Sequence, residues 1–178
     1  MEALKHTEWV FGVWFIWFAL YDYNIATNPA WIVIILIGSQ LPDYLGLFLR
    51  KLKCPAKSTR KLTHDYVFVF ALWFLFPFNI FPEINIFTTS IAIHYLVDLF
   101  SGLEPIYIAG FLFGEHTAIL YITNAHRIKI GQKIESWGSN YLVTETEEPT
   151  PELAWFWVMQ LAGTIFCGIG ILIYLLLS

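Results

Sequence analysis

The last apolar run of the sequence is the feature that most constrains the fold. It extends from Leu153 to Leu177, about 25 residues without a charged side chain, and about 20 apolar residues are enough to cross the ~30 Å hydrocarbon core of a bilayer. The chain as a whole is 57% hydrophobic and only 13% charged, whereas soluble domains carry about 25% charge. This composition excludes a disordered chain and an ordinary cytosolic enzyme, and it predicts an integral membrane protein.

Further apolar segments predict an all-α, polytopic membrane bundle of about five transmembrane helices in a single domain, 1–178. The expected spans lie near residues 9–25, 30–42, 66–81, 86–100 and 153–177. Pro42 is expected to end the second span and Pro77 to kink or end the third, because proline removes a helical hydrogen bond. The apolar segment 106–123 contains two glycines, Glu115 and His116, so it is either a further span or a re-entrant segment.

The basic residues predict the orientation of the chain. Six of the ten Lys and Arg residues fall in the loop 50–64, which the positive-inside rule places in the cytoplasm. Counting spans places the N-terminus on the same side. The basic residues of the linker 124–152 remain in the cytoplasm only if the segment 106–123 does not cross the membrane as a single span. The positive-inside rule therefore favours a re-entrant or interfacial segment at 106–123. We therefore expect a multi-pass protein of the cell membrane, in contact with membrane lipids.

Two further observations exclude other classes. The net charge is -4 and the cations cluster in loops, so the chain has no basic surface for nucleic acid. Cys54 and Cys167 have neither the spacing of metal ligands nor that of a disulfide scaffold. Both are interpreted as free thiols.

Ionisable residues inside membrane segments are costly, so each one requires a partner or a function. Under the predicted topology such residues fall at the cytoplasmic ends of four expected spans: His6, Asp43, His64, His94 and Asp98. His94 and Asp98 are four residues apart, which puts both on one helix face, where they could bind one ion. The same spacing is also typical of an imidazole hydrogen-bonded to a carboxylate inside a bundle, and His64 beside a basic loop is also typical of an interfacial residue.

Imidazole and carboxylate ligands together suit Zn, Mn or Fe. Such an ion lowers the pKa of a bound water toward ~7 and polarises a phosphoryl or carbonyl oxygen, so a divalent metal ion in a hydrolytic site is the expected cofactor. In this interpretation Arg60 holds a phosphate through its forked guanidinium. Thr63 or Ser101 orients a metal ligand, although a helix cap would explain either hydroxyl.

At these residues the sequence resembles the YdjM-like family of membrane-bound metal-dependent hydrolases. The family motifs are an early His, P-D-x-D, R-G-x-T-H-S and H-x-x-x-D-x-x-T, and they match in order over about residues 6–104. The matching positions are His6, Leu41-Pro42-Asp43, Arg60 with Thr63-His64, and His94 with Asp98 and Ser101. The resemblance implies a small multi-span fold with a metal site at these residues.

The sequence departs from the family pattern at several motif positions. Leu45 stands in place of the second Asp of P-D-x-D, and the other departures are Lys61 for Gly, Asp65 for Ser, Ser101 for Thr and Glu104 for Gly. The missing carboxylate at position 45 argues against a two-metal site. Asp65 or Glu104 could replace it, which makes Asp65 a further candidate catalytic residue.

Two functions fit these residues. One is a hydrolase acting at the cytoplasmic interface on an ester or phosphoester of a lipid or another amphiphile. The other is a non-catalytic subunit of a larger membrane complex, with other membrane proteins as partners, that keeps the fold and has lost the activity, as Leu45 suggests. A proton or ion pathway ranks last, because the ionisable residues gather at one face instead of spanning the membrane depth.

Overall fold

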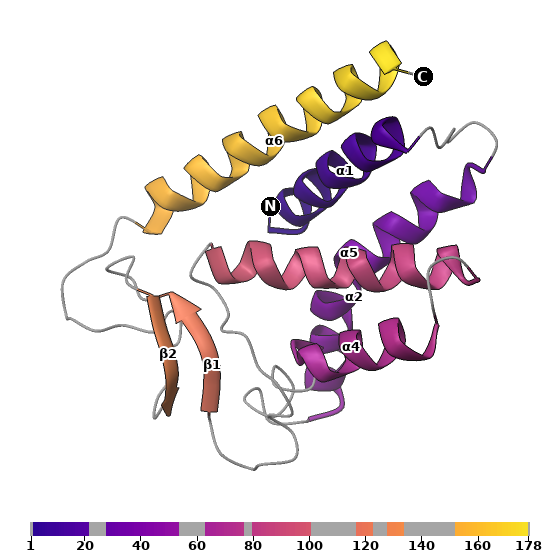
Figure 1. Ribbon diagram of the computed structural model, residues 1–178. Coiled ribbons are helices and arrows are strands. Elements are labelled where there is room, and N and C mark those ends of the chain that lie inside the picture. The colour runs from indigo at the N-terminus through magenta and orange to yellow at the C-terminus, as the bar shows by residue number, and fades with distance from the viewer. Residues whose placement is uncertain are drawn as a thin grey trace.

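The computed structural model describes residues 2–21, 28–53, 63–76, 80–100, 117–122, 128–133 and 152–177. These residues form five α-helices and one pair of strands (Figure 1). In chain order the elements are α1 (Glu2–Leu20), α2 (Ala30–Lys51), α4 (Tyr66–Leu75), α5 (Pro82–Phe100), β1 (Thr117–Ile122), β2 (Ile128–Lys133) and α6 (Glu152–Leu177). The predominantly helical character expected from the sequence is therefore present.

Two of the described helices are long and apolar enough to cross a membrane. They are α2, over Ala30–Lys51, and α6, over Val158–Leu177. The helix α4 is apolar but has only ten residues. α1 begins at Glu2 and includes Lys5 and Glu8 in its first turns, so its apolar part is shorter than the helix itself.

The expectation that Pro42 ends the second span is wrong. The helix α2 continues through Pro42 to Lys51, because a proline removes one backbone hydrogen bond while the residues after it keep the apolar helical pattern. α4 ends at Leu75, two residues before Pro77. A proline clashes sterically with a helical residue directly before it, so helices usually end ahead of a proline. α5 begins at Pro82, at the first helical position that proline tolerates.

Strands β1 and β2 form an antiparallel hairpin in which Thr117 lies opposite Lys133 and Ile122 opposite Ile128. β1 falls in the segment 106–123, so residues 117–122 do not belong to a helical span, and the all-α expectation is wrong for them. β2 falls within the expected linker 124–152. The physical reason is the composition of β1, T-A-I-L-Y-I, which is rich in β-branched and aromatic residues that favour strands.

The directions of the helices follow from their contacts. His6 contacts Asp43 and the ring of Phe18 stacks on Trp31, so α1 and α2 are antiparallel. Glu8 contacts Gln160, and further along both helices the ring of Phe15 lies against Tyr174. α1 and α6 are therefore parallel, and they lie side by side in Figure 1.

The central helix α5 runs parallel to α2 and antiparallel to α1 and α4. Its contact with α4 pairs Tyr66 with Ala92 and Trp73 with Thr89. Five helix ends consequently meet at one end of the bundle: the N-terminal ends of α1, α4 and α6 and the C-terminal ends of α2 and α5. The chain leaves α5 and enters α6 at this same end (Figure 1).

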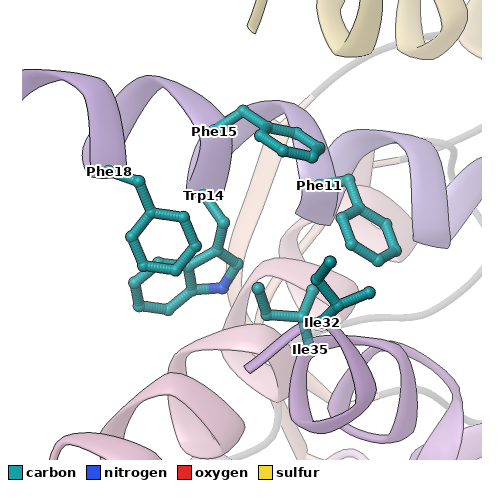
Figure 2. A pocket seen from close by; sticks show the side chains of 6 residues that line it. All are labelled: Phe11, Trp14, Phe15, Phe18, Ile32 and Ile35. Carbon is teal, nitrogen blue, oxygen red and sulfur yellow. The ribbon is translucent and has the colours of Figure 1, made fainter. Parts of the chain in front are cut away.

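Aromatic and aliphatic side chains fill the space between α1, α2 and α5. The buried cluster consists of Val10, Trp14, Phe18, Trp31, Ile35 and Ile86. On one side of this cluster a shallow apolar hollow lies between α1 and α2 (Figure 2). α2 and α5 approach closely at Gly38, where an added Cβ would lie 2.7 Å from the carbonyl oxygen of Phe87 and 2.7 Å from Cβ of Ser90.

Candidate metal centre

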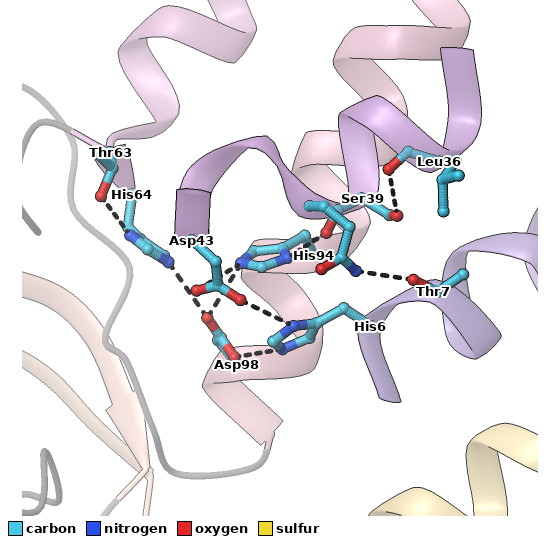
Figure 3. Close-up of polar contacts among 10 residues, drawn as sticks. His6, Thr7, Leu36, Ser39, Asp43, Thr63, His64, His94 and Asp98 are labelled. Carbon is cyan, nitrogen blue, oxygen red and sulfur yellow. Dashed lines mark hydrogen bonds and ion pairs between the residues drawn. The ribbon is translucent and has the colours of Figure 1, made fainter. Parts of the chain in front are cut away.

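The helix ends that meet at one end of the bundle carry the predicted metal ligands (Figure 3). They are His6 on α1, Asp43 on α2, His64 directly before α4, and His94 and Asp98 on α5. The side chain of Asp43 is 34% exposed, whereas those of the other four residues are buried. Residues that are up to 92 positions apart in the sequence thus form one compact group.

The carboxylate of Asp98 is the centre of this group. Its Oδ1 atom lies 2.6 Å from Nε2 of His6. Its Oδ2 atom lies 3.2 Å from Nε2 of His64 and 3.3 Å from Nε2 of His94. One buried carboxylate therefore contacts three imidazoles.

The hydrogen bonding of His94 defines its tautomer. Its Nδ1 atom lies 2.7 Å from the backbone carbonyl oxygen of Ser39, which can only accept, so Nδ1 carries a proton; in the neutral ring Nε2 then presents a lone pair. Nε2 is buried and has no hydrogen-bond partner among the described residues. The atoms that it faces are oxygens of Asp98 at 3.3 Å and of Asp43 at 3.9 Å.

This arrangement brings a ring nitrogen and two carboxylates together, and a cation between them would offset the repulsion of the two carboxylates. Metal-ligating histidines almost always donate their other ring N–H to a carbonyl or carboxylate, as His94 does to Ser39. Asp43, His64, His94 and Asp98 each offer one ligand atom, and these four atoms lie within 4.8 Å of one another. The group could bind a metal ion, and two nitrogens with two oxygens form a donor set suited to a divalent transition metal.

The other predicted residues near His64 support the segment that carries it. The hydroxyl oxygen of Thr63 lies 2.9 Å from Nδ1 of His64, and the carbonyl of Thr63 accepts a 2.6 Å hydrogen bond from the hydroxyl of Tyr95. Asp65 is the N-cap of α4 and accepts a 2.9 Å hydrogen bond from the backbone nitrogen of Val67. Several other positions discussed from the sequence lie outside the described residues: Cys54, Arg60, Lys61, Ser101, Glu104, Glu115 and His116.

Leu45 does not face this group. It lies two residues after Asp43 on α2 and is 37% exposed, and residues two apart on a helix do not share a face. The departure from the family pattern at this position therefore leaves the four gathered ligand atoms unchanged.

Sequence reasoning missed two contributors to the site. The first is the backbone carbonyl of Ser39, and the polar pair Ser39-Gln40 inside an otherwise apolar segment was the signal that could have found it; Gln40 itself donates a 2.7 Å hydrogen bond to Thr7. The second is Tyr95, one of nine tyrosines, which nothing in the sequence distinguishes from the others.

Fold and site together define a helical protein that has two helices able to cross a membrane and a His/Asp group able to bind a metal ion. Comparison of the chain with known protein families, with characterised proteins and with solved structures found no match.

Proposed function

We propose that this protein is a membrane-bound metal-dependent hydrolase of the YdjM-like type, with Asp43, His64, His94 and Asp98 as the metal ligands. The observation that carries this proposal is the buried Nε2 atom of His94, which faces two carboxylates with no hydrogen-bond partner among the described residues. A bound Zn, Mn or Fe ion would lower the pKa of water and polarise an ester or phosphoester oxygen.

The helix directions support a multi-pass topology in this proposal. The two described helices that are long and apolar enough to cross a membrane, α2 and α6, run antiparallel, so α2 ends and α6 begins on the same side of the bilayer. The basic residues Arg50 and Lys51, at the end of α2, lie at this same end of the bundle. By the positive-inside rule that end is cytoplasmic, together with the N-terminus and the metal centre.

The chain's own residues would shape the site for a substrate at the cytoplasmic interface. Asp43 is the partly exposed member of the group, so a substrate would approach from its side, while burial of the other ligands excludes water from behind. The carbonyl of Ser39 holds the ring of His94, and Thr63 holds that of His64. Arg60 is proposed, from the sequence alone, to contact a phosphate.

The proposal is tested by elemental analysis of the protein purified in mild detergent without chelator. We expect about one Zn, Mn or Fe ion per chain, and none in the variant His94→Ala/Asp98→Ala. Gly168→Ala is the matched control, because an added Cβ at Gly168 meets nothing within 4 Å, and it should keep the ion. A wild-type protein without metal, or a double variant with unchanged metal content, would refute the metal centre.

The metal-loaded protein is then assayed with lipid phosphoesters and carboxylic esters in mixed micelles. Turnover by the wild type that is lost in His94→Ala/Asp98→Ala and kept in Gly168→Ala is the expected result. The alternative is a non-catalytic membrane subunit, which the departure at Leu45 suggests from the sequence. No metal, together with a larger protein that co-purifies in fixed ratio, would establish that alternative.

A further inference from the structure

His6 is placed differently from the other two histidines of the group. The Nε2 atoms of His64 and His94 both approach Oδ2 of Asp98, at 3.2 and 3.3 Å, whereas Nε2 of His6 approaches Oδ1, at 2.6 Å. The four ligand atoms that lie within 4.8 Å of one another do not include one from His6.

In Asp43, as in Asp98, the two carboxylate oxygens lie near different histidines. His6 approaches Oδ2 of Asp43 with its Nδ1 atom at 3.5 Å, while Oδ1 of Asp43 is turned toward Nε2 of His94 at 3.9 Å. In both carboxylates one oxygen is therefore next to His6 and the other next to His94. Figure 3 shows the ring of His6 on one side of the two carboxylates.

We propose that His6 is a positioning residue of the metal centre and not one of its ligands: its Nε2 atom holds one oxygen of Asp98, so that the second oxygen of Asp98 faces the ion. This inference rests on the proposed metal centre. A carboxylate has two equivalent oxygens, and a contact to one of them restricts which oxygen can turn toward an ion. His6 supplies such a contact to Asp98 from the helix α1, and its Nδ1 atom lies 3.5 Å from Asp43 with no hydrogen-bond partner among the described residues.

The ring of His6 also restrains its neighbour. Its centroid lies 4.0 Å from that of His94, with 46° between the ring planes. The ring of His94 is thus held on one side by His6 and at Nδ1 by the carbonyl of Ser39. Loss of such supporting partners typically reduces metal affinity by about 10- to 100-fold without abolishing binding.

The experiment counts the imidazoles that coordinate Cu²⁺, used as a spectroscopic probe at one equivalent per full-length chain in detergent. Pulsed EPR should detect two coordinated imidazoles in the wild type, two in His6→Ala and one in His94→Ala. His6→Ala should bind Cu²⁺ about 10- to 100-fold more weakly than the wild type. His6→Gln should recover part of this affinity, because the amide nitrogen can replace Nε2 as the donor to Asp98. If His6→Ala fails to fold, the imidazole count and the affinity are measured on His6→Gln instead.

The possible results separate this inference from the function on which it rests. Three imidazoles in the wild type and two in His6→Ala or His6→Gln would make His6 a ligand and overturn the inference, while the metal centre would stand. Unchanged Cu²⁺ affinity in both variants would also overturn it. A wild type in which Cu²⁺ has no coordinated imidazole would refute the proposed centre itself, and this inference with it.

Discussion

Replacement of Gly38 by alanine tests whether the packing of α2 against α5 controls the metal centre from a distance. Gly38 is not one of the four proposed ligands. Its added Cβ would lie 2.7 Å from the carbonyl oxygen of Phe87 and 2.7 Å from Cβ of Ser90. Both neighbours belong to α5, and one of them is backbone, so side-chain rotation alone cannot relieve the contact.

The size of the effect follows from these distances. Ordinary van der Waals contact begins at 3.4 Å, so α2 and α5 must separate by about 0.7 Å at this crossing. Gly38 precedes Ser39, whose carbonyl oxygen accepts a hydrogen bond from His94 at 2.7 Å. A rigid-body separation would lengthen this bond to about 3.4 Å, beyond the ~2.7–3.2 Å range of N–H···O hydrogen bonds.

We therefore expect two measurable losses in Gly38→Ala. Overpacking at a tight helix crossing should lower the free energy of unfolding by about 1–3 kcal/mol. Loss of the bond that orients His94 should weaken Zn²⁺ binding by about 10- to 100-fold. The measurements are thermal unfolding in mild detergent and Zn²⁺ titration against a chromophoric chelator.

Gly168→Ala is the control for this prediction, since its added Cβ meets nothing within 4 Å, and we expect it to match the wild type in both assays. The reasoning would be refuted if Gly38→Ala bound Zn²⁺ as tightly as Gly168→Ala. A loss of stability without a loss of affinity would show that the bond from His94 to Ser39 survives the separation, or that it does not control the centre.

Three further predictions concern positions around the site. Leu45→Asp should leave the metal content at one ion per chain by elemental analysis, because residue 45 is on another face of α2 from the ligand; a second ion would contradict this. Tyr95→Phe removes the donor to the carbonyl of Thr63, so thermal unfolding should report a loss of about 0.5–1.5 kcal/mol, with weaker Zn²⁺ binding. Glu8→Ala deprives the amide of Gln160 of its acceptor on α1 and should lower stability by about 1–3 kcal/mol; a change in its metal content would argue against a purely structural role.

Local sequence was sufficient to predict the helices but not all of their ends. Uncharged apolar runs long enough to cross a bilayer predicted α6 almost to the residue. Pro42 was misread because a proline inside a helix removes only one backbone bond, and the residues beyond it outweighed that loss. The hairpin was missed because a short apolar run, T-A-I-L-Y-I, has no periodicity that separates a strand from a helix.

The candidate ligands could also be named from local sequence. Ionisable side chains are rare in apolar segments, so His94 and Asp98 stand out from the apolar residues that surround them in the chain. Counting spans then placed their partners at the same end of the bundle. Ser39 and Tyr95 could not be found in this way, because neither is ionisable at neutral pH; only the polar pair Ser39-Gln40 marked the first of them, and a tyrosine in an apolar helix is common.

The sequence by itself determined the apolar helical character of this protein and the chemistry of its candidate site, because both depend on which side chains occur at which spacing along one segment. Only the tertiary structure decided how those side chains are used. The crossing of α1, α2 and α5 determines which oxygen of Asp98 faces His6 and in which direction each ring nitrogen points. It also determines the outward position of Leu45. Helix crossings are set by packing between residues distant in sequence, as at Gly38.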